Sequence, residues 1–129
     1  MIKIVSTREF IIARSTSFFW WKRIYVGVRF FTLSDAQREA VLAHEEGHCN
    51  LHHSELRSLA VLLCPFLIKW VCHKTEYAAD LYAAERGLAK PLIQVLNNDK
   101  RETVLHPSNR NRRKALEQYE YLRLTPVKC

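Results

Sequence analysis

Residues 34–53 read SDAQREAVLAHEEGHCNLHH, a stretch with the pattern of a capped helix. The hydroxyl of Ser34 can cap the first turn, and Gln37, three residues later, completes a capping box. Asp35 places a negative charge at the positive end of the helix dipole. Small and apolar residues then recur at helical spacing. We therefore expect a helix from Asp35 to about His53.

Two histidines of this helix, His44 and His48, are four residues apart, so their Cβ atoms lie on one face about 5–6 Å apart. Two neutral imidazoles at that spacing can bind one zinc ion. Glu45 follows the first histidine, where a carboxylate can take a proton from a water molecule that the metal acidifies. This run is the HExxH arrangement of zinc peptidases. Gly47 costs about 1 kcal/mol in helix propensity, which indicates a reason for a smooth backbone beside the metal face.

A catalytic zinc ion needs a third protein ligand and an open coordination position. The candidate ligand is Glu76 in the run TEYAAD, residues 75–80, which would project from a second helix. Asp80 is four residues later, hence on the same face, and could accept a hydrogen bond from the non-metal nitrogen of His44 or His48. The alternative for both carboxylates is a solvated helix face. The alanines around them argue instead for close packing against another helix.

The spacing of the other residues predicts no second metal site, either from His52 and His53 or from the cysteines. His52 lies eight residues after His44, about 12 Å along the helix axis, which is too far for one shared ion. We therefore expect His52 and His53 to be surface residues at the helix end. The four cysteines, at positions 49, 64, 72 and 129, form no CxxC pair. Their spacing predicts buried free thiols.

The runs HEEGH and EYAAD together resemble the HExxH…ExxAD pattern of gluzincin peptidases. The chain is most similar to the HtpX-like and CAAX-prenyl-protease-like family and its small soluble relatives, the minigluzincins, over about residues 24–120. The resemblance implies a zincin-like domain with the activity of a zinc-dependent endopeptidase. By this match His44, His48 and Glu76 hold Zn²⁺, and Glu45 is the general base that later protonates the leaving amine.

Two further expectations come from the resemblance alone. In the family, a strand before the HExxH helix forms a rim where an extended peptide or protein substrate pairs, and Ile24–Phe31 matches that place. The family also carries an HP…R element, which reads here as His106-Pro107 followed by Arg112. By that match, His106 and Arg112 lie near the cleft. There they either stabilise the oxyanion or order the cleft wall through hydrogen bonds.

Two other functions are compatible with the motif. An ImmA/IrrE-like metallopeptidase, which cleaves a repressor, shares HExxH and a later acidic ligand, but it usually sits beside a DNA-binding module, and none is evident here. A zincin-fold protein that binds zinc without activity would have its fourth coordination position blocked, by Cys129 in the tail or by His106.

The composition is that of a basic globular protein. The chain has 129 residues, 48% of them hydrophobic, and a net charge of +7. This length suits one domain over residues 1–129, and the apolar content excludes a disordered chain. The charge favours anionic partners without choosing among them, and no motif for specific nucleic-acid binding is visible. The N-terminal residues make a poor signal peptide, so we expect a cytoplasmic protein.

Two apolar stretches are candidates for contact with a membrane surface, which would make the protein peripheral to the membrane. Leu59–Cys72 spans 14 residues with Pro65 inside, whereas a spanning helix needs about 20. It predicts a buried helix pair or an interfacial segment. Phe18-Phe19-Trp20-Trp21, followed by Lys22-Arg23, suits either a membrane interface or the edge of a core strand.

The pattern of the whole chain predicts an α+β fold. We expect strands at residues 2–6, 9–14 and 24–31, and helices at 35–53, at 56–72 with a break at Pro65, at 76–86 between a Thr75 cap and Gly87, at 91–96, and at 108–122 with a Ser108 cap. The expected architecture is a small, mostly antiparallel sheet over the metal helix, completed by further helices. The cleft would lie between the rim strand and the metal helix.

Overall fold

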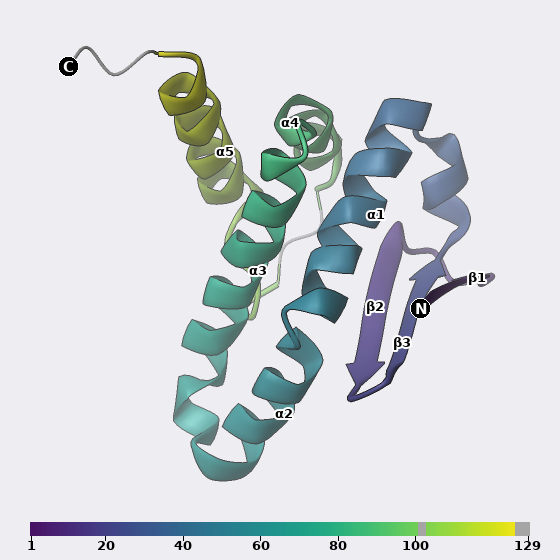
Figure 1. Cartoon of the computed structure of the whole chain (residues 1–129), viewed down its shortest axis with the longest axis vertical. Helices are drawn as coiled ribbons and strands as arrows, with labels where there is room; N and C mark the ends of the chain where they lie inside the picture. The colour runs from purple at the N-terminus through teal and green to yellow at the C-terminus, as the bar shows by residue number, and fades with distance from the viewer. Residues whose placement is uncertain (101–102, 126–129) are drawn as a thin grey trace.

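The computed structural model describes residues 1–100 and 103–125 and has an α+β fold, as predicted (Figure 1). The elements of the described residues are β1 (Ile2–Ser6), β2 (Ala13–Phe18), β3 (Trp21–Val26), the 3₁₀ helix η1 (Val28–Thr32), α1 (Asp35–Asn50), α2 (His53–Leu63), the 3₁₀ helix η2 (Pro65–Leu67), α3 (Ile68–Glu85), α4 (Ala89–Asn98) and α5 (Asn109–Leu124). A three-stranded sheet lies against one side of α1, and α3 and α5 lie on the opposite side, while α2 follows the end of α1 and also contacts β2.

The sheet is mixed, with the strand order β1-β3-β2. The central strand β3 pairs in parallel with β1 and antiparallel with β2, so the expectation of a mostly antiparallel sheet holds for only one of the two pairings. The prediction that Ile24–Phe31 forms the rim strand is wrong. Both edges of β3 are already paired, and the chain leaves the sheet after Val26 to enter η1. The strand that flanks α1 is β2.

The strand expected at residues 9–14 begins later, at Ala13, because the residues before it cross the end of β3. The amide of Gly27 donates to the carbonyl of Ile12, and the amide of Val28 donates to that of Glu9. A Cβ atom on Gly27 would lie 2.4 Å from the carbonyl oxygen of Ile11. Glycine therefore permits this crossing.

The helix that carries the histidines is α1, and its predicted start is confirmed. The Ser34 hydroxyl accepts from the amide of Gln37 at 3.3 Å, and the Gln37 side chain accepts from the amide of Ser34 at 3.1 Å. The helix ends at Asn50, earlier than expected, because His52 adopts a left-handed conformation with φ of 55°. The chain turns there and starts α2 at His53.

The break at Pro65 is confirmed, since α2 ends at Leu63 and η2 follows. The predicted cap at Thr75 is wrong, because α3 runs without interruption from Ile68 to Glu85. The Thr75 hydroxyl instead donates to the carbonyl of Cys72 one turn earlier, at 2.9 Å.

The predicted end of α3 and the predicted start of α5 are confirmed, whereas the predicted length of α4 is too short. Gly87, with φ of 81°, follows the end of α3, as a glycine that ends a helix does. The next helix, α4, is longer than the expected span of 91–96. The hydroxyl of Ser108 accepts from the amide of Asn111 at 3.2 Å and caps α5.

Close packing of α1 against α3 dominates the helical part of the core. A Cβ atom on Gly47 would lie 3.0 Å from the Cβ of Tyr82 and 3.2 Å from the Cα of Ala79. Buried alanines such as Ala40 and Ala83 extend this contact along both helices. Since Gly47 has no side chain, α1 approaches the base of the Tyr82 side chain and the backbone of Ala79 closely. Glycine is therefore required at position 47 because α3 leaves no room there for a side chain.

The apolar segments are less buried than the sequence suggested. Cys49 and Cys72 are buried free thiols, as predicted, whereas Cys64 is only half-buried and Cys129 lies outside the described residues. The reading of Phe18-Phe19-Trp20-Trp21 as a core strand edge is wrong, because all four side chains are exposed. The expected frayed tail at 125–129 lies largely outside the described residues as well. No helix in the described ranges has the length and hydropathy required to cross a bilayer.

Replacing Gly47 by leucine tests the close packing of α1 on α3. Leucine favours a helix over glycine by about 1 kcal/mol. However, overpacking costs about 1–3 kcal/mol, and the upper end applies here because even a Cβ atom would lie 3.0 Å from Tyr82. We expect a net loss of about 2 kcal/mol in the free energy of unfolding, measured by urea denaturation.

The matched control is Ser58→Leu on the exposed face of α2, which adds a similar side chain where space is open. That variant should unfold near the wild-type midpoint. A Gly47→Leu protein as stable as the wild type would contradict the close approach.

Candidate metal centre

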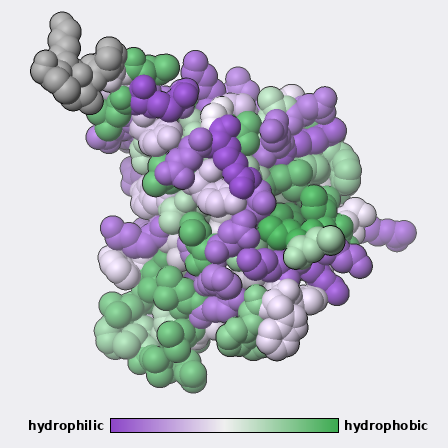
Figure 2. Space-filling view, viewed as in Figure 1, coloured by the Kyte–Doolittle hydropathy of each residue, from purple (hydrophilic) through white to green (hydrophobic). Residues whose placement is uncertain are grey.

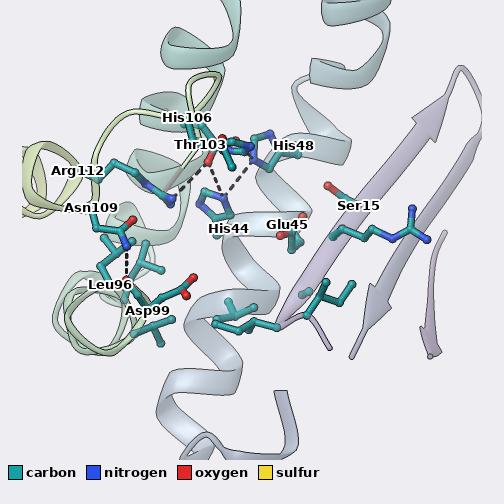
Figure 3. Close-up of a pocket in the computed structure, with 18 of the residues that line it drawn as sticks. Ser15, His44, Glu45, His48, Leu96, Asp99, Thr103, His106, Asn109 and Arg112 are labelled. Carbon is teal, nitrogen blue, oxygen red and sulfur yellow. Dashed lines mark hydrogen bonds and ion pairs between the residues drawn. The ribbon is translucent and has the colours of Figure 1, made fainter. Parts of the chain in front are cut away.

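A cleft of about 460 Å³ opens between β2 and the helices (Figure 3). One wall is formed by β2 and the residues just before it, 11–15, and the floor by α1. The opposite wall comes from α4 and from the segment between Thr103 and Arg112. His44, Glu45 and His48 line the cleft, so the motif of α1 faces the space where a ligand could bind.

Three potential metal ligands converge in this cleft. The Nε2 atoms of His44 and His48 are 3.1 Å apart. A carboxylate oxygen of Glu76, from α3, lies 3.5 Å from the first nitrogen, and its other oxygen lies 3.3 Å from the second. Ligands about 2.0–2.1 Å from a tetrahedral zinc ion lie about 3.3–3.4 Å from one another. The spacing and the nitrogen and oxygen donors therefore fit a zinc ion.

The group is buried, with Glu76 only 3% exposed. Within the described residues it is the one set of histidine, cysteine and acidic side chains whose ligand atoms lie within 4.8 Å of one another. A buried carboxylate is costly unless opposite charges surround it, and Arg57 and Arg112 contact Glu76 from two sides. These contacts keep Glu76 ionised, the form in which a carboxylate binds a metal ion.

The second nitrogen of His44 is held by Asp80. His44 Nδ1 lies 2.9 Å from Asp80 Oδ1, at ion-pair distance but without the alignment of a good hydrogen bond. Arg112 of α5 in turn binds Asp80 with two bonds, from Nε at 2.8 Å and from Nη2 at 2.6 Å. The sequence-predicted Asp80 and Arg112 therefore belong to one chain of contacts that leads to His44.

The second nitrogen of His48 meets a residue that the sequence reading placed on the surface. His53 is buried, and its Nδ1 lies 2.8 Å from Nδ1 of His48. The expectation of an exposed His53 is wrong because the chain turns at His52 instead of continuing the helix. His52 itself is exposed, as predicted. The contact depends on the early end of the helix at Asn50, and no residue pattern in the sequence indicated that end.

Glu76 is also contacted from α2, by a residue that the sequence reading missed. Arg57 Nη2 donates to Glu76 Oε1 at 2.8 Å and to the hydroxyl of Thr75 at 2.6 Å. His106 Nδ1 lies 3.3 Å from the same carboxylate oxygen and is partly exposed to the cleft. Burial alone would raise the pKa of Glu76, but the contacts with His106 and the two metal-facing histidines outweigh it and lower that pKa.

The pKa values of His44 and His48 are shifted in opposite directions. Burial opposes a charge on His44, yet Asp80 and Glu76 outweigh this effect and raise its pKa to about 9. Burial lowers the pKa of His48, which favours the neutral form that binds metals. Burial, with the nearby charges of His48 and Arg57, also lowers the pKa of His53 to about 4. A neutral His53 can accept a hydrogen bond from the Nδ1–H of His48.

Glu45 lies on the side of α1 that faces β2, with Ser15 across the cleft (Figure 3). It is half-buried and lies beside the metal-facing histidines without joining their ligand group. This is the place for a base beside the metal that does not bind it.

The comparisons with known proteins agree with this geometry. The family model for peptidase family M48 matches residues 17–99, about two thirds of the chain. The matched region contains the three metal-facing side chains and Asp80, and ends before His106 and Arg112. Neither the curated proteins nor the solved structures gave a match. The chain belongs to peptidase family M48, a family of zinc metallopeptidases.

Proposed function

We propose that this chain is a zinc-dependent endopeptidase that cleaves extended segments of peptides or proteins. The observation that carries the proposal is the convergence of two Nε2 atoms and one carboxylate in a cleft next to Glu45. Membership of family M48 supports this function over that of a repressor-cleaving ImmA/IrrE-like enzyme.

His44, His48 and Glu76 would hold the zinc ion, which supplies a Lewis acid that polarises a carbonyl and acidifies water. Glu45 acts as the general base. It accepts a proton from the attacking water and then passes that proton to the amine that leaves when the peptide bond breaks. The half-buried position of Glu45 at the cleft supports this role, because a base must reach both groups.

The substrate backbone pairs with β2. This strand gives one edge to β3 and borders the cleft with the other, so the backbone of residues 13–15 along the cleft can bind an extended peptide. Part of the opposite wall is apolar, where Leu92, Val95 and Leu96 of α4 line the cleft. An apolar substrate side chain would be removed from water there, so we expect a preference for such residues near the cleaved bond.

His106 and Arg112 take different roles in this proposal. Two nitrogens of Arg112 bind Asp80, and the third, Nη1, lies 3.5 Å from Glu76 Oε2, which supports a role in positioning Asp80, His44 and Glu76. His106 is 46% exposed and lies at the cleft, so its imidazole can reach a substrate oxygen. We assign the stabilisation of the oxyanion to His106 and the ordering of the cleft wall to Arg112.

Glu45→Gln tests the general base. The amide has nearly the same shape but cannot accept the proton, so hydrolysis of an unfolded protein should fall about 10²–10⁴-fold. Zinc content, measured on the same preparation, should stay at the wild-type level because Glu45 is not a ligand.

Glu46→Gln is the matched control, since Glu46 points to Arg86 instead of the cleft. It should retain wild-type turnover. Undiminished hydrolysis by the Glu45→Gln protein would refute the mechanism.

Removal of the metal tests the ligand set. Treatment with a chelator should abolish hydrolysis, and added zinc should restore it. Glu76→Gln weakens the only anionic ligand, so the zinc content after dialysis should fall well below one ion per chain. If Glu76→Gln retained one tightly bound zinc ion, Glu76 would not be a ligand.

His53→Phe tests the contact behind His48. Phenylalanine keeps a ring of similar size but offers no acceptor to the Nδ1–H of His48, so zinc affinity should fall about 10–100-fold. Competition with a chromophoric chelator measures this change.

The control is His52→Asn, because asparagine tolerates the left-handed backbone at this exposed position. Its zinc affinity should equal that of the wild type. An unchanged affinity in the His53→Phe protein would show that the contact does not support the metal centre.

A further inference from the structure

One end of the molecule carries many exposed apolar side chains that the metal centre does not use. In Figure 2 this surface gathers over the corner between α2 and α3 and beside the tip of the β2–β3 hairpin. We call these two parts together the apolar end. Its exposed members are Phe18, Phe19, Trp20 and Trp21 of the hairpin, and Leu59, Val61, Leu62, Leu63, Phe66, Leu67 and Trp70 of the corner.

The hairpin and the corner are fixed to one another through Glu55 at the start of α2. One oxygen of Glu55 accepts from the hydroxyl of Ser17 at 2.9 Å, and the other accepts from the amide of Phe19, also at 2.9 Å. The amide of Ser17 donates to the hydroxyl of Ser54 at 3.3 Å. The two parts of the apolar end are therefore presented by one connected piece of structure.

The most prominent side chains are aromatic. Trp20 is 86% exposed and Phe66 is 81% exposed, one at each part of the apolar end. A soluble protein rarely exposes so many large apolar side chains at one place without a partner for them. Tryptophan and phenylalanine are also the residues that enter the boundary between lipid headgroups and acyl chains.

The charges around the apolar end are mostly positive. Lys22 and Arg23 follow the aromatic run of the hairpin, and Lys69 and Lys74 lie on α3 next to the corner. The acidic group there, Glu55, is occupied by its bonds to Ser17 and Phe19. Two of these cations lie beside the rings, with Arg23 4.4 Å from the ring centre of Trp21 and Lys74 5.8 Å from that of Trp70.

We propose that the apolar end docks onto the surface of a bilayer that contains anionic lipids. The aromatic and aliphatic side chains would enter the interface, while the lysines and arginines would meet the negative headgroups. No helix in the described residues is long and apolar enough to span the bilayer, so the contact is peripheral. A second copy of the chain is a poorer occupant, because a symmetric interface would bring the same positive charges together.

The tryptophans make the docking directly measurable. The chain has three, and Trp20, Trp21 and Trp70 all belong to the apolar end. The zinc-supplemented full chain should show a blue shift of its emission with vesicles of phosphatidylcholine containing about 30% phosphatidylserine. Brominated acyl chains should quench that emission. Pure phosphatidylcholine vesicles should give a much weaker response, and added salt should weaken binding to the anionic vesicles.

Variants separate the apolar and the charged contributions. Trp20→Ser combined with Phe66→Ser should lower the partition coefficient for anionic vesicles, measured by flotation, at least tenfold. Lys69→Gln and Lys74→Gln should lower it about fivefold each. The control is Tyr121→Ser with Leu122→Ser on α5, which removes two side chains of comparable exposure elsewhere and should leave partitioning unchanged.

Three results would overturn the proposal. They are the absence of a blue shift with anionic vesicles, equal binding to neutral vesicles, and an apolar-end variant that partitions like the wild type. A fourth result would also overturn it: a wild-type dimer in sedimentation that is absent from the Trp20→Ser, Phe66→Ser variant. The apolar end would then bind a second copy of the chain instead of a membrane. Because hydrolysis of a soluble peptide is measured separately, failure of the docking and failure of the peptidase proposal are distinguishable.

Discussion

The separation of α1 and α3 controls the metal centre. The two histidines project from α1 and the carboxylate from α3, so their ligand atoms converge only if the helix backbones approach closely. Gly47 meets Ala79 and the base of the Tyr82 side chain at this contact, and the absence of a side chain at position 47 lets the helices come together. A larger residue at position 47 or 79 would move Glu76 away from the histidines, although neither residue touches the metal site. The small residues of the core thus have a chemical as well as a structural effect.

A second requirement is that the polar and charged groups buried by the close packing have partners. Each metal-facing side chain has a partner behind it. His44 contacts Asp80, His48 contacts His53, and Glu76 contacts Arg57. These partners come from α3, from the first residue of α2 and from its second turn, so both helices after α1 contribute to the orientation of the ligands. Side chains held in this way lose little freedom when a metal binds, because most of their conformational entropy is lost on folding.

Local features of the fold were predictable from the sequence because short-range chemistry determines them. The capping box at Ser34, the break at Pro65 and the cap at Ser108 all depend on residues within one or two helical turns. The grouping of His44, His48, Glu76 and Asp80 follows from helical spacing and the resemblance to known peptidases, and the structure brings these side chains together.

Features that depend on tertiary structure were not predictable in the same way. The strand order, which places β3 in the centre and β2 at the cleft, is a property of the whole sheet. The inward position of His53 depends on a single left-handed residue, His52, where no glycine signals the turn. The exposure of the aromatic hairpin depends on what fails to cover it, and an apolar pattern alone cannot distinguish a buried surface from an exposed one.

The corner between α2 and α3 also has an architectural consequence. The histidines precede it in the chain and Glu76 follows it, yet residues 64–67 lie at the end of the molecule away from α4 and α5 (Figure 1). Extra chain inserted there would lengthen the connection between the two halves of the metal centre without touching any of its contacts. Each doubling of such a loop costs only about 0.6 kcal/mol in closure entropy. This architecture can therefore accommodate large insertions at one point while helix packing keeps the zinc ligands in register.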